Sequence, residues 1–501
     1  MPSPLFPWPG NRRRLRWTGV SPPGTDVGKR ALIALRWAAA ARLAGQALSW
    51  IVTVVVIRLL SPADYGLLAM AVILPTTLYL INDLGLDVVL VQNQAPDPAF
   101  LRQVFGVVIA INLLCAGLLL LGAPLVAEFF HEPRVIPIVR VLSLLFVLCV
   151  FETLPRARLE QRLDFRSQSM VTLVATCLSA LTTLALAWIG AGVWALVWGR
   201  LCATAVTVLG LNLLAPSLYW PSFSLAAVKR SLSFGSLVTL ERAAWQVFTD
   251  ADKAIGGRLW GEATLGLYTV AQDLATMPMH RTASFINSIG LPAFSRVQDR
   301  LDDVRFYLLK VTRIMSVMSF PLFVGLAVTA PETVALLLGP QWPGAAPILR
   351  ILALIMPLRM LATLLPPVLW GISRPAVSAG NGCIAAAVVV GACLVGVRWG
   401  AVGMAGAWLA AYPVAFVITL HRAGKVIDLT LRDFAAAMLW PAVAAGLMAA
   451  AVTVARAVVP GATAPGVALL ILVPTGAVTY VAALLVLHRS SFRETLALVS
   501  R

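Results

Sequence analysis

The chain has 501 residues, of which 59% are hydrophobic and only 12% are charged, and its mean hydropathy is +0.87. About a quarter of the residues in a soluble domain are charged, so this composition excludes an ordinary soluble protein and predicts a chain that sits in lipid. The net charge of +17 does not indicate nucleic-acid binding, because the basic residues gather in short loops between apolar runs.

The predicted elements begin with a tail and continue as a series of apolar helices. Residues 1–29 are rich in Pro and Arg and lack an apolar stretch, and we interpret them as a disordered basic cytoplasmic tail rather than a signal peptide. Apolar runs of about 20 residues follow, each long enough to cross a bilayer as a helix. They occupy residues 36–59, 65–84, 102–126, 135–155, 168–189, 191–214, 232–257, 264–290, 306–329, 346–371, 376–397, 400–420, 433–456 and 465–487. The sequence therefore predicts an all-α integral membrane protein with about fourteen transmembrane helices.

Basic residues mark every second loop between these runs. They are Arg156, Arg158, Arg162 and Arg166, then Lys229 and Arg230, then Arg296, Arg300 and Arg305, and finally Arg422, Lys425 and Arg432. The alternate loops, such as residues 61–64 and 330–341, carry few basic residues or none. Because Lys and Arg are enriched in cytoplasmic loops, this pattern predicts a multi-pass protein with both termini in the cytoplasm.

The chain also resembles itself. The segment that starts at Arg58-Leu59 recurs 200 positions later at Arg258-Leu259, and two further segments, which start at Pro133 and Gly190, recur 210 positions later. The offset covers six spans, an even number, so the two copies keep one orientation, as parallel repeats do. We therefore expect an N-lobe of six spans at residues 30–220, a C-lobe of six spans at residues 221–425, and an appended helix pair with a cytoplasmic tail at residues 426–501.

Ionisable side chains recur inside the predicted spans, where they are expensive and usually face a cavity or a partner. Span 1 carries Arg42, Gln46, Ser49 and Thr53 on one helical face, and span 7 carries Arg242, Gln246, Asp250 and Lys253 with the same spacing. Span 8 carries Asp273, His280, Ser284 and Asn287 on one stripe, with Arg281 beside it.

These stripes predict a hydrated cavity with a cationic lining. Arg42, Arg242, Lys253 and Arg281 are the candidate ligands of an anionic substrate such as a diphosphate, because the arginine fork can donate two hydrogen bonds at once. Asp250, Asp273 and His280 are the candidates for exchanging a coupling cation. The alternatives are that Asp250 and Lys253 only neutralise each other, and that Glu241 holds Arg242 or Arg281.

Other kinds of site are not indicated. The six cysteines are scattered through apolar runs, which predicts buried free thiols without a disulfide framework or a metal site. The glycine-rich segment at residues 24–30 is one residue short of a P-loop and lacks its final Ser or Thr. No loop is large enough for a catalytic domain, so we expect a transporter that is not an enzyme and has no cofactor.

Several motifs together resemble the Wzx-type polysaccharide flippases of the multidrug/oligosaccharidyl-lipid/polysaccharide exporter superfamily. They lie within about residues 35–425 and are Arg58-Leu59-Leu60-Ser61-Pro62-Ala63-Asp64-Tyr65-Gly66, Leu159-Glu160-Gln161-Arg162-Leu163-Asp164-Phe165, Asp252 to Tyr268, Leu291-Pro292-Ala293-Phe294-Ser295-Arg296, and Leu338-Gly339-Pro340-Gln341-Trp342 with Ile348 to Leu352.

The resemblance implies a flippase of the bacterial inner membrane. Its cargo would be an undecaprenyl-diphosphate-linked oligosaccharide for O-antigen, capsule or exopolysaccharide synthesis, moved by alternating access. The implied partners are membrane lipids, an H⁺ or Na⁺ gradient, and a polysaccharide polymerase or export machinery. The alternative is a cation-coupled drug antiporter, which would want an acidic, aromatic-lined cavity. The match at residues 338–352 argues against a peptidoglycan-precursor flippase, and the lack of a large external loop argues against a glycan polymerase or ligase.

Overall fold

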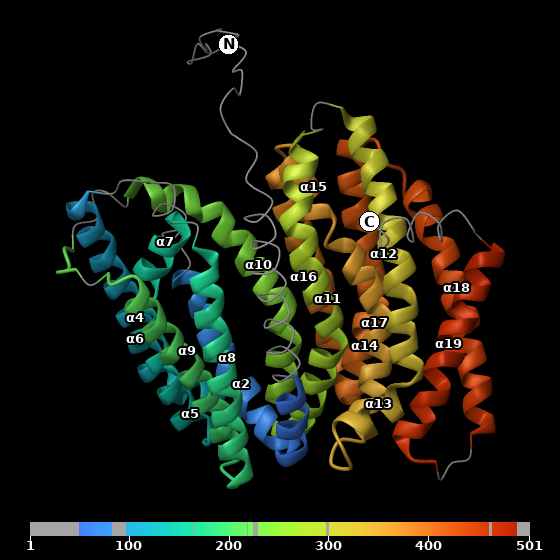
Figure 1. Cartoon of the computed structure of the whole chain (residues 1–501), viewed down its shortest axis with the longest axis horizontal. Helices are drawn as coiled ribbons and strands as arrows, with labels where there is room; N and C mark the ends of the chain where they lie inside the picture. Colours follow the sequence, from blue (N-terminus) through green and yellow to red (C-terminus); the bar gives the residue numbers. More distant parts are fainter. Residues whose placement is uncertain are drawn as a thin grey trace, which may run out of the picture.

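The computed structural model describes residues 50–82, 97–162, 164–217, 219–223, 229–296, 300–459 and 463–487 (Figure 1). Every regular element in these ranges is helical. The helices that precede residue 220 are a segment at Trp50–Leu59, α2 (Pro62–Asn82), α4 (Pro98–Phe130), α5 (Val135–Leu142), α6 (Leu144–Cys149), α7 (Thr153–Gln161), α8 (Phe165–Trp188) and α9 (Val193–Leu214).

The helices after residue 228 follow one another closely. They are α10 (Lys229–Trp260), α11 (Glu262–Arg296), α12 (Leu301–Val328), α13 (Ala330–Leu337), α14 (Ala345–Ala362), α15 (Leu365–Gly371), α16 (Pro375–Gly396), the short 3₁₀ helix η1 (Val397–Trp399), α17 (Gly400–Ile427), α18 (Leu431–Val458) and α19 (Pro465–Leu487).

Local sequence explains where several of these helices begin and end. Asp97, Asp164 and Thr430 precede α4, α8 and α18, and each side chain accepts a hydrogen bond from a backbone N–H two or three residues further on. This satisfies a donor that has no partner within the helix. At the other end of α4, His131 adopts the left-handed conformation with φ 56°, and its N–H returns to carbonyls of the last turn.

Each of the predicted spans overlaps a helix or a broken helix, but two apolar runs are interrupted. The run at 135–155 is divided among α5, α6 and α7, and the run at 346–371 is divided between α14 and α15. In the described residues, 8 helices are long and apolar enough to cross a membrane, and 2 bent pairs bring the number to as many as 10. The chain is therefore an all-helical, multi-pass membrane protein. The number of about fourteen spans stays a prediction. The count of 10 omits the more polar α10 and α11, takes Pro375–Ile427 as one helix, and takes Trp50–Leu59 with Pro62–Tyr79 as one bent pair.

The internal repeat is visible in the backbone. Residues 131–142 and 341–352 share the same succession of turn and helix, and residues 133–140 and 343–350 share the same pattern of buried and exposed positions. Gly190 and Gly400 both have positive φ, 78° and 69°. We use "first repeat" for the described helices up to α9 and "second repeat" for α10 to α17. The lobe boundaries at residues 220 and 425 remain predictions.

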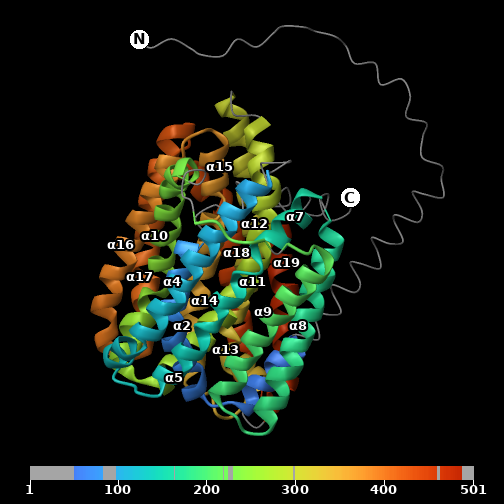
Figure 2. The same ribbon diagram turned by 90° about the vertical axis from the view of Figure 1, so that its left-hand side faces the viewer.

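The helices form two groups with α2 and α10 between them (Figure 1). Helices α4 to α9 gather on one side and α11 to α19 on the other, and the turned view in Figure 2 shows α2 behind α4. A hydrophobic cluster within α2, α4, α5, α6 and α9 holds the first group together, and a larger cluster holds the second. Helices α18 and α19 pack against α12 through a cluster of their own. Helix α2 packs more extensively against α11, its counterpart in the second repeat, than against the helices of its own group.

Candidate functional site

The polar face of α10 holds the described part of the predicted site. Asp250 accepts a hydrogen bond from the amide of Gln246 and forms an ion pair with Lys253, with 3.4 Å between Nζ and Oδ1. Both ionised side chains are about one-fifth exposed, at 22% and 20%. Lys253 also interacts electrostatically with Asp273 of α11 and with Asp252. The structure therefore brings Lys253 together with both predicted acidic candidates that it describes.

This arrangement bears on the role assigned to Lys253. A lysine that is shared among three carboxylates is neutralised by the protein itself, as in the alternative interpretation of the Asp250–Lys253 pair. Binding of a diphosphate at Lys253 would have to displace part of this network. The assignment of Lys253 as an anion ligand stays a prediction.

The other candidates lie outside the described residues or are described only by their backbone. Arg42 precedes the first described residue, and Arg242, His280 and Arg281 belong to α10 and α11 with side chains outside the described part. The backbone does place Arg242 in line with Lys253 along α10, because a separation of eleven residues completes about three turns. No other geometry is assigned to these four side chains.

The sequence interpretation missed the most enclosed carboxylate, Asp252, which is 1% exposed. Its Oδ2 accepts hydrogen bonds from the Tyr268 hydroxyl at 2.7 Å, from Gln272 Nε2 at 2.9 Å and from Trp408 Nε1 at 2.9 Å. Its Oδ1 accepts from the backbone N–H of Lys253 at 2.8 Å. Four donors from α10, α11 and α17 therefore converge on one carboxylate, which compensates for much of the hydration that it loses.

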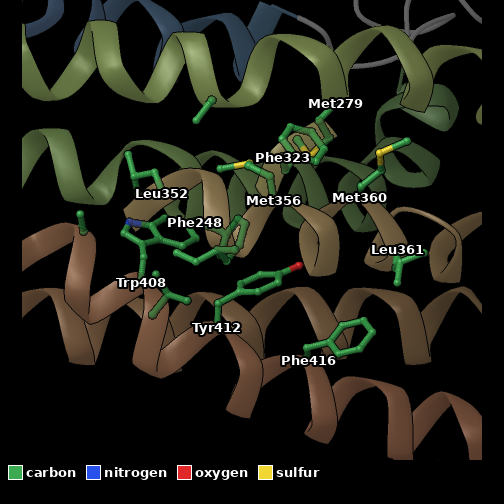
Figure 3. Close-up of a cluster of buried hydrophobic side chains, with 14 of the residues drawn as sticks. Phe248, Met279, Phe323, Leu352, Met356, Met360, Leu361, Trp408, Tyr412 and Phe416 are labelled. Atoms are coloured by element: carbon green, nitrogen blue, oxygen red, sulfur yellow. The ribbon is translucent and has the colours of Figure 1, made fainter. Parts of the chain in front are cut away.

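Two positive charges accompany Asp252. Lys253 follows it in the chain, and Arg359 of α14, which is 5% exposed, also interacts electrostatically with it. Its guanidinium lies over the ring of Trp408 at 4.7 Å and over that of Phe248 at 5.5 Å. Figure 3 shows Phe248, Trp408 and Tyr412 side by side in this cluster. A buried carboxylate with hydrogen-bond donors and a stacked guanidinium fixes α10, α11, α14 and α17 relative to one another.

The available signals for this cluster were Arg359, a lone charge in an apolar run, and Asp252, which lies between the charged residues Asp250 and Lys253. Asp252 is the first residue of one of the family-like motifs and Tyr268 is the last, and the two side chains are hydrogen-bonded to each other across 16 positions. Around Asp252 and Lys253, the described charges are three carboxylates, Asp250, Asp252 and Asp273, against two cations, Lys253 and Arg359. The predicted excess of positive charge depends on Arg42, Arg242 and Arg281.

The sequence is similar to those of proteins of polysaccharide biosynthesis. A family model described as "Polysaccharide biosynthesis protein" matches residues 55–347. The chain is 23% identical over 333 residues to the lipopolysaccharide biosynthesis protein WzxC of Escherichia coli (strain K12), covering 65% of this chain and 67% of that protein. It is 27% identical over 379 residues to the succinoglycan biosynthesis transport protein ExoT of Rhizobium meliloti (strain 1021), covering 74% and 76%.

Solved structures share the fold. The lipid II flippase MurJ in an inward closed conformation superposes with a TM-score of 0.71 and 14% identity, over 91% of this chain and 99% of that one. An inward-facing multidrug resistance transporter of the MATE family gives a TM-score of 0.59 with 16% identity, over 78% and 99%. At such low identity the similarity extends to the fold alone.

Proposed function

This chain belongs to the polysaccharide biosynthesis protein family, as its motifs predicted, and from that membership we propose that it is a flippase for lipid-linked oligosaccharides. The cargo is an undecaprenyl-diphosphate-linked repeat unit, and the route runs from the cytoplasmic to the outer leaflet of the bacterial inner membrane. The product feeds O-antigen, capsule or exopolysaccharide synthesis. Relatives that are named for lipopolysaccharide and succinoglycan biosynthesis support this class of cargo.

The observation that carries the proposal is the polar face of α10. This helix lies between the two groups of helices (Figure 1). An ionised stripe on a helix that is enclosed by other helices usually faces water, a polar cargo or a charged partner, and the partial exposure of its side chains favours access of water here. Gln246, Asp250 and Lys253 form that stripe, and Asp273 faces it from α11.

In the proposed mechanism, Arg42, Arg242 and Arg281 hold the diphosphate, since an arginine fork matches phosphate oxygens, while the lipid tail stays in the bilayer. Lys253 joins them when its carboxylates are neutralised. Uptake of a proton or Na⁺ by Asp250, Asp273 or His280 provides that neutralisation and couples transport to a gradient. The two repeats rock about the site to open it to either side.

The test is the double variant Arg42→Ala/Arg242→Ala in the native host. Surface polysaccharide should be lost, lipid-linked repeat units should accumulate on the cytoplasmic face, and the amount of the variant in the membrane should be unchanged. A matched control is Arg140→Ala/Arg350→Ala, because these arginines also form a repeat-related pair but are exposed in the first two turns of α5 and α14. Normal surface polysaccharide in the Arg42/Arg242 variant would reject the cationic site.

One observation favours a second candidate, the cation-coupled drug antiporter. Three carboxylates surround Lys253, and aromatic rings of Phe248, Trp408 and Tyr412 lie close by, a composition that suits organic cations. However, Asp252 and Trp408 are each only 1% exposed, so their part of the cluster is not a cavity wall. Energised efflux of a cationic dye by the purified protein in vesicles would favour the antiporter over the flippase.

A further inference from the structure

Two repeat-related arginines join the repeats at one end of the molecule. Arg58 ends the Trp50–Leu59 helix and donates hydrogen bonds to two carbonyls at the end of α13, those of Leu336 and Leu337, the latter at 3.2 Å. Arg258 lies near the end of α10 and donates to the carbonyl of Phe129 at the end of α4, at 2.8 Å. Each arginine thus reaches from a helix of one repeat to a helix of the other.

The acceptors share one property. Carbonyls in the last turn of a helix have no partner within it and carry the negative end of the helix dipole, so a guanidinium is favoured there. Arg258 adds a stacking contact, because its guanidinium lies 4.8 Å from the centre of the Phe129 ring. The two contacts differ in detail, but both place a positive charge on the last turn of a helix in the opposite repeat.

A crossing of two glycines lies between these contacts. A Cβ added to Gly66 of α2 would lie 1.8 Å from the carbonyl oxygen of Glu262, and one added to Gly266 of α11 would lie 1.7 Å from that of Pro62. These four positions are also related by the offset of 200 residues. The first turns of α2 and α11 therefore touch backbone to backbone, in the same way from either side.

Further contacts enclose the crossing. The indole N–H of Trp342, which is 0% exposed, donates to the carbonyl of Ile57 at 3.1 Å, and its ring meets Tyr65 edge-on. Arg134, in the turn after α4, forms an ion pair with Glu262 at 2.8 Å. This end of the molecule is the one predicted to lie outside the cytoplasm, because its loops are poor in Lys and Arg.

We infer that Arg58 and Arg258 are paired latches that hold this end of the two repeats closed and release it when the cargo leaves. The inference rests on the proposed transport cycle, but it concerns opening of the closed end rather than binding of the cargo. Both side chains are exposed, and both acceptors are neutral carbonyls. Water can replace either partner when the contact breaks, whereas a buried ion pair would leave an uncompensated charge.

The experiment measures opening directly with a cysteine at Ile57, a residue that is 7% exposed and packed in the cluster of the second repeat. Ile57→Cys is placed in a chain whose six native cysteines are replaced by alanine, and intact cells are treated with a membrane-impermeant maleimide. Arg258→Ala is the decisive variant, because Arg258 is the latch on the opposite side from the reporter. We expect roughly tenfold faster labelling, the shift produced by the loss of one charge-assisted contact from a two-state equilibrium.

Three controls make the result interpretable. Arg258→Lys keeps the charge but can fill fewer donor positions, and it should restore most of the slow labelling. The exposed arginine pair Arg140→Ala/Arg350→Ala should leave labelling unchanged. Arg58→Ala should act in the same direction as Arg258→Ala, and the double variant should label fastest.

Labelling of Ile57→Cys that does not change in Arg258→Ala, or that rises equally in the exposed-pair control, would overturn the latch. If Arg258→Ala fails to fold, Arg258→Gln takes its place, because glutamine lacks the positive charge, and labelling of Arg258→Gln at the parental rate overturns the latch in the same way. The proposed function is judged separately, by accumulation of lipid-linked units in the Arg42/Arg242 variant. A flippase without latches and latches on a different transporter therefore give different results.

Discussion

The two repeats agree at the closed end and differ in their interiors. Both supply a latching arginine and a crossing glycine, yet the buried ionic cluster belongs to the second repeat alone among the aligned positions. Where the second repeat has Asp252, Tyr268 and Gln272, the first has the apolar Val52, Leu68 and Val72 at the offset of 200. At the offset of 210, Arg359 corresponds to Cys149 and Trp408 to Trp198.

Burial follows the same division. Trp408 is 1% exposed and donates to Asp252, whereas Trp198 is 46% exposed. Val52 belongs to an apolar cluster that includes Val56 and Ala195. The two repeats thus share the arginine and glycine contacts through which they meet, whereas only the second repeat has the buried cluster around Asp252. The interior of the second repeat is therefore held by buried polar contacts, and that of the first repeat by apolar contacts.

The largest effect is expected from breaking that ionic core. Asp252→Leu leaves Arg359 buried without its carboxylate, which should reduce stability by about 3–5 kcal/mol. The measurement is the thermal midpoint of the detergent-solubilised protein, followed by size-exclusion chromatography. The matched change in the first repeat, Val52→Leu, alters only apolar volume and should cost less than about 3 kcal/mol.

A second variant separates the effect of an unpaired buried charge from the effect of changed side-chain packing. Asp252→Leu/Arg359→Met removes both charges and should recover much of the midpoint that Asp252→Leu loses, since replacing a buried pair by apolar residues is often close to neutral. A single Asp252→Leu variant as stable as the parent would mean that the cluster does not hold the second repeat together.

The next largest effect tests whether the two glycines of the crossing are equally important. Gly66→Ala and Gly266→Ala each place a methyl group within 1.8 Å of a backbone oxygen of the other repeat, so each should cost about 1–3 kcal/mol and reduce export. The control is Gly117→Ala on α4, where a Cβ would meet nothing within 4 Å. Helix propensity alone makes that change neutral or stabilising by up to about 1 kcal/mol. Unequal effects of the two crossing variants would show that the crossing is not symmetric in function.

The sequence predicts the helices well and the interior poorly, for physical reasons. Apolar runs of the length of a bilayer locate the spans, and the repeat identifies equivalent turns such as those that precede α5 and α14. The breaks at Ser143 and at Thr363–Leu364 lie inside apolar sequence, where hydropathy carries no signal. Helices α10 and α11 coincide with the predicted runs at 232–257 and 264–290, although they are more polar than the other long helices.

The candidate site shows the same limit. The spacing of Gln246, Asp250 and Lys253 identified one face of α10, and the structure connects these three side chains. Asp252 lies off that stripe, and its side-chain partners are 16, 20 and 156 positions away. Such partners become neighbours only through packing of separate helices, so no periodicity within α10 could reveal them.

The smallest expected effect lies at a position where the repeats differ, Glu132 in the first and Trp342 in the second. Hydrogen bonds from Arg134 lower the pKa of Glu132 below its ordinary value of 4.5. Because the pKa is lower in the folded protein, the interaction stabilises the fold above about pH 4.5 and is lost as the pH falls through the lowered value. Glu132→Gln should therefore reduce stability by less than about 1 kcal/mol at pH 7, since Arg134 is largely exposed, and this difference should vanish in strong acid.

Thermal midpoints of the parent and Glu132→Gln at pH 7 and pH 3 test the prediction, and a difference that grows toward pH 3 would contradict it. The corresponding change in the second repeat, Trp342→Phe, removes an uncharged donor to Ile57 and should give a loss of stability that is the same at both pH values.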